Sequence, residues 1–162
     1  MSVETERKFL VCGDAWKALV QKRELIRQGY ICRTAADHKT VRVRIRDGKG
    51  FLTLKAPKSG VERFEYEYEI PVADAGELLD RFCVPPLIEK YRNTVPAGNG
   101  LVWEIDEFLG DNAPLVLAEI ELPDADAFFE LPDWIGKDVS DDVRYYNSNL
   151  IKQPYSCWKS RG

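Results

Sequence analysis

Hydrophobic and polar residues alternate with a period of two through most of this chain, in segments of strand length that end at turn residues. Because successive side chains of a strand point to opposite faces of a sheet, the pattern predicts strands with one apolar and one polar face. Glycine-containing turns at 47–50 and 97–100 favour hairpins, so neighbouring strands should be antiparallel. We expect eight strands, at about 2–11, 29–36, 39–47, 50–56, 61–71, 88–95, 100–109 and 114–123.

Helical spacing appears between some of these strands. An apolar stripe over 15–28 predicts one helix, with Asp14 as its N-cap. A second helix is expected to begin at Asp74 and to end before Pro85. Shorter helices are expected over 124–130 and 140–151.

The polar faces of the predicted strands carry charges of both signs. The cations on these faces are Lys8, Arg42, Arg44, Arg46, Lys55, Arg63, Lys90 and Arg92, and the acids are Glu4, Glu6, Glu65, Glu67, Glu69, Glu104, Asp106, Glu119 and Glu121. For one strand alone, a solvated face is the ordinary explanation. Taken together, the strands favour a closed barrel whose charged faces point at one another, with helices covering the apolar faces outside. The predicted fold class is therefore mainly β (α+β), an eight-stranded antiparallel closed β-barrel with helices packed on the outside.

Composition narrows the class of protein. A length of 162 residues suits a single domain, 1–162, with its core at about 1–151 and a C-terminal tail at 152–162. Since 23 Lys and Arg balance 27 Asp and Glu, we expect no nucleic-acid partner. No apolar run is long enough to span a bilayer, no apolar leader is visible, and the four cysteines are widely spaced, so we expect a cytoplasmic protein with reduced thiols. The one histidine, His38, is expected in a solvated turn.

A charged lumen of this kind predicts a phosphoryl-transfer site. Burying many ions costs several kcal/mol each, roughly, so a salt-bridge network alone is a weak explanation. Arginines from several strands suit a polyphosphate, because their forked donors match phosphate oxygens. Clustered carboxylates suit a hard cation such as Mg²⁺ or Mn²⁺.

The N-terminal run Glu4-Thr5-Glu6-Arg7-Lys8 carries an E-x-E-x-K pattern, and segments such as 40–44, 65–71, 118–122 and 142–147 follow in order. With these motifs, about residues 1–151 resemble the short bacterial members of the CYTH superfamily, the triphosphate tunnel metalloenzymes. The resemblance implies metal-binding carboxylates at Glu4, Glu6, Glu119 and Glu121. It implies triphosphate-binding cations at Lys8, Arg42, Arg44, Lys55, Lys90 and Arg92. Lys8, Tyr30 and Glu6 are the implied catalytic residues, with Tyr30 in contact with Lys8, whereas Arg46 and Arg63, near strand ends, are left outside this set.

The expected activity is the hydrolysis of inorganic triphosphate to pyrophosphate and phosphate, dependent on Mg²⁺ or Mn²⁺. One alternative is another triphosphate chemistry of the same family, namely a nucleoside or thiamine triphosphatase or a class IV adenylyl cyclase. Another is a non-catalytic polyphosphate-binding module. The expected partner is a small triphosphate and not a membrane, and a homodimer is left open.

Overall fold

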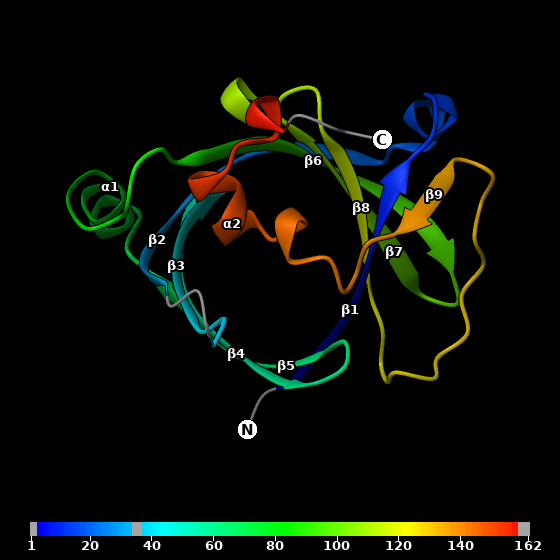
Figure 1. Ribbon diagram of the computed structural model, residues 1–162, viewed down its shortest axis with the longest axis horizontal. Coiled ribbons are helices and arrows are strands. Elements are labelled where there is room, and N and C mark those ends of the chain that lie inside the picture. Colours follow the sequence, from blue (N-terminus) through cyan, green and yellow to red (C-terminus); the bar gives the residue numbers. More distant parts are fainter. Residues whose placement is uncertain (1–2, 34–36, 159–162) are drawn as a thin grey trace.

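Nine β-strands form one continuous sheet in the computed structural model, which describes residues 3–33 and 37–158. The strands are β1 (Val3–Val11), β2 (Lys22–Arg33), β3 (Thr40–Arg46), β4 (Lys49–Ser59), β5 (Glu62–Ile70), β6 (Ile88–Gly98), β7 (Leu101–Phe108), β8 (Val116–Glu121) and β9 (Ile135–Asp138). Their order is β5-β4-β3-β2-β6-β7-β8-β1-β9, and a further β5–β1 pairing closes the first eight into a barrel (Figure 1). Every pairing is antiparallel. The predicted fold class is confirmed.

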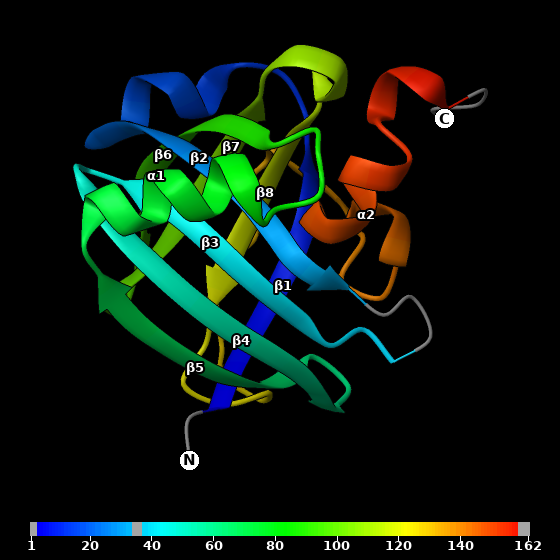
Figure 2. The same ribbon diagram turned by 90° about the vertical axis from the view of Figure 1, so that its left-hand side faces the viewer.

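Strict alternation within the strands divides the chain between the lumen and the outer surface. In β3, Arg42 and Arg44 are buried on one face, and Val43, between them, is fully buried on the other. Val43 belongs to an outer hydrophobic cluster with Ala75 and Leu79 of α1 (Val72–Arg81), which lies against the outside of β3 and β4 (Figure 2). The same residue pattern therefore sends apolar side chains under a helix and charged ones into the barrel.

A second outer cluster covers the opposite part of the barrel. Trp103, Ile105 and Ile120 are fully buried there, and Trp16, from the 3-10 helix Ala15–Leu19, packs with them. The burial of such large apolar side chains outside the strands keeps the lumen available for polar groups.

The C-terminal segment covers one end of the lumen. The 3-10 helix Val143–Tyr145 leads into α2 (Asn147–Lys152), which contacts β2 and β6 and lies within the outline of the strands in Figure 1. Leu150 of α2 is fully buried in a cluster with Tyr30 and Phe108. These two residues lie on the lumen-facing sides of β2 and β7. Farther on, after α2, Trp158 packs its ring against Tyr145, so the described part of the expected tail also folds onto the barrel.

Several expected elements differ from the structure. The helix expected over 15–28 is wrong: only 15–19 is helical, in the 3-10 form, and the rest begins β2. In β2 the buried lumen positions include Glu24, Ile26 and Gln28, while Leu25 is 43% exposed, so mixed polarity on each face hides the period of two. Of the segments 124–130 and 140–151, the first has no helix and the second is divided into two short helices.

Other differences concern boundaries. Helix α1 begins at Val72 after Pro71, two residues before the expected start. Strand β9 was not expected, and the end of the expected strand 29–36 lies outside the described residues. None of the described helices is long and apolar enough to cross a membrane; the longest, α1, has 10 residues.

Candidate active site

A polar cavity occupies the lumen beside the C-terminal segment. All six cations expected to bind triphosphate line it, together with two of the expected metal-binding acids. The expected cations that line it are Lys8, Arg42, Arg44, Lys55, Lys90 and Arg92, and the expected acids are Glu6 and Glu119. These side chains come from β1, β3, β4, β6 and β8. Residues far apart in the sequence therefore share one enclosed space.

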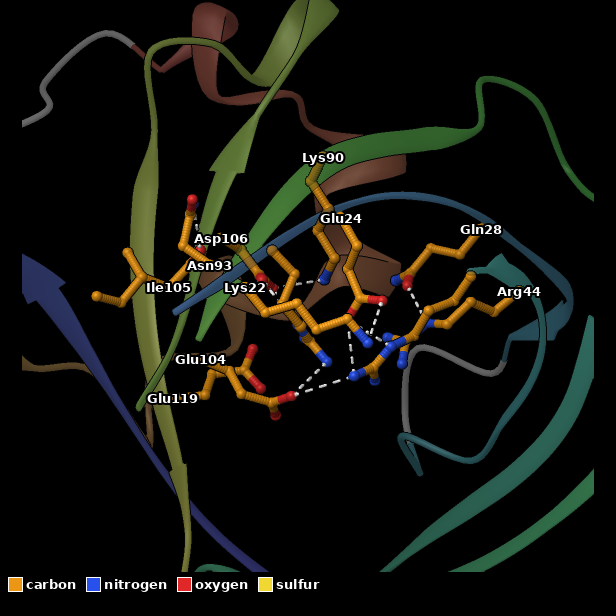
Figure 3. A network of polar contacts seen from close by, with 12 residues as sticks. Lys22, Glu24, Gln28, Arg44, Lys90, Asn93, Glu104, Ile105, Asp106 and Glu119 are labelled. Atoms are coloured by element: carbon orange, nitrogen blue, oxygen red, sulfur yellow. Dashed lines mark hydrogen bonds and ion pairs between the residues drawn. The ribbon is translucent and has the colours of Figure 1, made fainter. Parts of the chain in front are cut away.

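Asp106 holds two of these cations in place. Its carboxylate lies 2.8 Å from Lys90 Nζ (Figure 3). It also accepts bonds of 2.8 and 2.9 Å from Arg92 Nε and Nη2. Burial alone would raise the pKa of Asp106, but Arg92 and Lys90 outweigh it and lower that pKa below the usual 3.8. Burial lowers the pKa of Lys90 to about 7 against the opposing effect of Asp106.

Arg44 and Arg42 have donors that carboxylates of the protein do not use, although Arg42 Nη2 lies 3.6 Å from Glu67 Oε1. Arg44 Nε donates a 2.8 Å bond to Gln28 Oε1, a neutral partner. Burial, followed by repulsion from Arg42 and Arg92, lowers the pKa of Arg44 to about 9. In the described part of the chain, the buried Nε of Arg42 has no hydrogen-bond partner. An orphaned donor and the mutual repulsion of clustered arginines in one cavity favour an anionic ligand.

The two carboxylates that line the cavity, Glu6 and Glu119, have pKa values shifted in opposite directions. Burial, and then the charges of Glu119 and Glu4, raise the pKa of Glu6 well above 4.5. Burial also disfavours the charged form of Glu119, but Lys8 and Arg92 outweigh it and hold the pKa of this carboxyl well below its usual value. The pKa values of the two carboxyls therefore shift in opposite directions, and Glu6 is the one of the pair that is more readily protonated.

Glu4 and Glu121 lie apart from the lining of this cavity. Glu4 Oε1 is 3.0 Å from Lys55 Nζ, and burial nevertheless raises the pKa of Glu4. Glu121 is exposed and lies opposite Glu6 in the register of β1 and β8. Neighbouring residues nevertheless cover part of its carboxyl, and this partial burial, followed by the nearby charges of Glu4 and Glu104, raises its pKa.

The acidic side chains fit a divalent cation whose remaining ligands come from a bound phosphate and from water. Within residues 3–33 and 37–158, no three His, Cys, Asp or Glu side chains come close enough to hold a metal alone. Burial raises the pKa values of Glu4, Glu6 and Glu121, and repulsion from neighbouring carboxylates raises them further, so a bound cation would stabilise their charged forms. Mg²⁺ is commonly bound by one or two carboxylates, phosphate oxygens and water. This donor set therefore matches an ion shared with a bound phosphate.

Lys8 and Tyr30 both line the cavity, but they have separate partners. Lys8 Nζ donates to the backbone oxygen of Tyr145 at 3.2 Å and lies 3.7 Å from Glu119 Oε1. The Tyr30 hydroxyl accepts a 3.2 Å bond from Gln28 Nε2. Among the described residues, no bond joins Tyr30 to Lys8.

Some lining residues were missed from the sequence. His38, expected in a solvated turn, and Arg63, left outside the set, both line the cavity. The Arg63 guanidinium lies 4.4 Å from the ring centre of Tyr146, and the His38 ring meets the same tyrosine edge to face. The signal for Arg63 was present, since it alternates in phase with the lumen residue Glu65. Tyr146 belongs to the C-terminal segment, whose place in the lumen no local pattern indicates.

Comparison with known proteins agrees with this geometry. The sequence profile of the CYTH domain matches residues 2–155. An inorganic triphosphatase of Acetivibrio thermocellus is 53% identical over 159 residues, which make up 98% of this chain and 99% of that protein. An inorganic triphosphatase of Nitrosomonas europaea is 37% identical over 153 residues, or 91% of this chain and 95% of that protein.

The fold has solved relatives as well. A crystal structure of an inorganic triphosphatase is similar with a TM-score of 0.63 and 34% identity, and the match covers 93% of this chain and 95% of that one. Sequence and structure comparisons thus agree over nearly the whole chain.

Proposed function

Because this chain belongs to the CYTH domain family, we propose that it hydrolyses inorganic triphosphate to pyrophosphate and phosphate inside its barrel. The observation that carries the proposal is the set of six cations, from four strands, that line one enclosed cavity together with Glu6 and Glu119. The names of two relatives, both inorganic triphosphatases, support the choice of substrate. The whole chain is proposed to act as a single domain.

The cations would bind the phosphate chain. Arg42 and Arg44 offer donors that carboxylates leave unused, and Lys8 and Lys55 line the same space. Interactions in such a low-dielectric, preorganised site strengthen relative to water. Binding and electrostatic stabilisation would therefore supply most of the rate enhancement.

Glu6 and Glu119, with Glu4 and Glu121 as further donors, would hold the divalent ion, which we propose to be Mg²⁺ or Mn²⁺. When bound, the ion neutralises charge on the phosphate oxygens. The carboxylates of the site, Glu6 among them in its ionised form, would position the attacking water and accept its proton. The water oxygen forms a bond to the terminal phosphorus, the bridging P–O bond breaks, and pyrophosphate leaves with that electron pair. Lys8 would stabilise the developing charge, with Tyr30 supporting the site through Gln28.

Phosphate release from inorganic triphosphate, ATP and thiamine triphosphate, measured side by side with Mg²⁺ or Mn²⁺ and with EDTA, tests the proposal. We expect hydrolysis of inorganic triphosphate to be the fastest and to disappear in EDTA. A strong preference for ATP or thiamine triphosphate would favour the other triphosphate chemistries. Tight binding without turnover in any metal would favour the non-catalytic module.

The proposal needs no nucleic-acid or membrane partner and holds for a monomer or a homodimer. We place the reaction in the cytoplasm. Free thiols at Cys12, Cys83 and Cys157 support a reducing compartment.

A further inference from the structure

Asn147, the first residue of α2, extends from the C-terminal segment into the charged lumen. Its Oδ1 accepts a 2.9 Å bond from Lys90 Nζ and a 3.1 Å bond from Gln28 Nε2. These partners come from β6 and β2, which are 57 and 119 positions away in the sequence. One carboxamide oxygen thus links the C-terminal segment to two strands of the barrel.

The neighbouring bonds fix the orientation of this carboxamide. The ammonium of Lys90 is only a donor. Gln28 uses its Oε1 to accept from Arg44 Nε at 2.8 Å, so its Nε2 is the atom left to face Asn147 (Figure 3 shows the Gln28–Arg44 bond). If the amide of Asn147 were turned over, its NH₂ group would face two donors. Oδ1 must therefore point at the network and Nδ2 away from it.

The Nδ2 group of Asn147 is then a donor without a use in the described part of the chain, where Asn147 makes only the two bonds through Oδ1. The side chain lines the same cavity as Lys8, Arg44 and Lys90. Because two hydrogen bonds to its oxygen already fix the carboxamide, the NH₂ group loses little conformational freedom when it binds a further acceptor.

We propose that Asn147 is a substrate-binding residue, whose Nδ2 donates to a phosphate oxygen of the bound triphosphate. The identity of the anion rests on the proposed function, but the donor geometry does not. The C-terminal segment, besides closing the lumen, thereby contributes a contact to the ligand.

Substitutions of Asn147, alone and combined with substitutions of its two partners, separate this role from a purely positioning one. Asn147→Asp keeps an oxygen for Lys90 and Gln28 but replaces the NH₂ donor by a second, negatively charged oxygen. Asn147→Ala removes both the acceptor and the donor. If Nδ2 binds phosphate, affinity should fall in the order wild type, Asn147→Ala, Asn147→Asp. The charge added by Asn147→Asp weakens anion binding in either case, so the decisive comparison is Asn147→Ala made alone and in a background with Lys90→Ala and Gln28→Ala. If Asn147 only positions Lys90 and Gln28, the substitution should cost no further affinity in that background, whereas a direct contact from Nδ2 predicts a loss in both backgrounds.

Calorimetric titration of the whole protein with inorganic triphosphate in EDTA measures this order without interference from a metal bound to the new carboxylate. A hydrogen bond to a charged acceptor corresponds to about 10-fold to 100-fold in affinity, so we expect a loss of that size in Asn147→Ala and a larger one in Asn147→Asp. Gln153→Glu is the matched control, because it makes the same amide-to-acid change on an exposed residue after α2, and its affinity should equal that of the wild type. Thermal unfolding of each variant identifies any that fails to fold.

Steady-state hydrolysis adds a second readout. Asn147→Ala should raise KM more than it lowers kcat, since the contact is present in the ground state as well as in the transition state. Wild-type affinity in Asn147→Asp, no loss in Asn147→Ala, or a loss in Asn147→Ala that disappears in the Lys90→Ala and Gln28→Ala background would overturn the inference without contradicting triphosphate hydrolysis. If the wild type binds triphosphate without hydrolysing it, the proposed function fails and these affinities still decide the role of Asn147. If the wild type does not bind triphosphate, both ideas fail.

Discussion

Asp106→Asn removes one negative charge from the most deeply buried ion network of the barrel. The Asp106 side chain has no exposed surface, and its partners Lys90 and Arg92 are 1% and 5% exposed at their side chains. Asparagine has nearly the same shape, so the cavity stays filled. The substitution leaves Lys90 without its carboxylate and Arg92 with only Glu104, 3.3 Å away, and it places an NH₂ group near one of the two cations.

The expected cost follows from this geometry. Removing one partner of a buried ion pair costs about 3–5 kcal/mol, because the remaining charge is left desolvated. For a domain of this size, each kcal/mol lowers Tm by about 2–4 °C, which gives a decrease of roughly 6–20 °C. Because the pKa of Asp106 is lowered in the folded protein, its stabilising contribution is present above the usual pKa of 3.8 and is lost as the pH falls through the folded value. The difference between wild type and variant should therefore shrink in acid.

Urea unfolding followed by tryptophan fluorescence at pH 7 measures the change, with Glu107→Gln as the control on the same strand. Glu107 is half-buried, accepts a 3.0 Å bond from Asn93 and lies 3.6 Å from Arg23, so its loss should cost under about 1 kcal/mol. Inorganic triphosphate should restore part of the stability of Asp106→Asn, since the anion supplies negative charge to the lumen. A loss below about 1 kcal/mol in Asp106→Asn would refute the view that this carboxylate holds the cations in place.

Three further changes test other parts of the molecule. Glu6→Gln should lower metal-dependent hydrolysis by about 10²-fold or more while metal-free binding of triphosphate changes little, and an unchanged kcat would contradict the role of Glu6. Arg44→Ala should raise KM about 10-fold to 100-fold, and because Arg44 is buried this increase in KM should vary little with salt concentration. An increase that disappears at high salt would place the Arg44 side chain in solvent. Gly50→Ala should lower the free energy of unfolding by about 1–3 kcal/mol in a urea titration, because its new Cβ would lie 2.7 Å from Ala75 Cβ and 3.0 Å from the Ile70 oxygen. The control Gly76→Ala has open space around its new Cβ and should not destabilise the protein.

The strands whose two faces differ in polarity could be predicted from the sequence. In β3, valine and isoleucine alternate with Arg42, Arg44 and Arg46, and the structure places Val43 under α1 and the first two arginines in the lumen. β2 could not be predicted in full, because its lumen face contains Ile26 beside Glu24 and Gln28, and a mixed face has no period of two. Closure of the barrel could be inferred only by considering all the charged faces together.

The residues of the candidate site likewise fall into a group that the sequence predicts and a group that it does not. Its cations and the acids Glu6 and Glu119 lie on regular strands, so alternation assigns them to a common face. The contributions of the C-terminal segment depend on contacts such as Asn147 with Gln28, across 119 positions, which no local pattern encodes. Arg63 and Tyr146 meet for the same reason, through the return of the chain to the lumen.

Strand β1 is made first but completes the barrel last. Its early residues pair with β5, as at Glu4 opposite Arg63, and its later ones with β8, as at Lys8 opposite Glu119. During translation a nascent chain therefore carries an unsatisfied strand until the ribosome has delivered the eighth one, and contacts this distant in sequence form slowly. Polypeptides cut short by a premature stop codon would lack the ligand cavity and expose an open strand edge, which makes them candidates for aggregation and degradation.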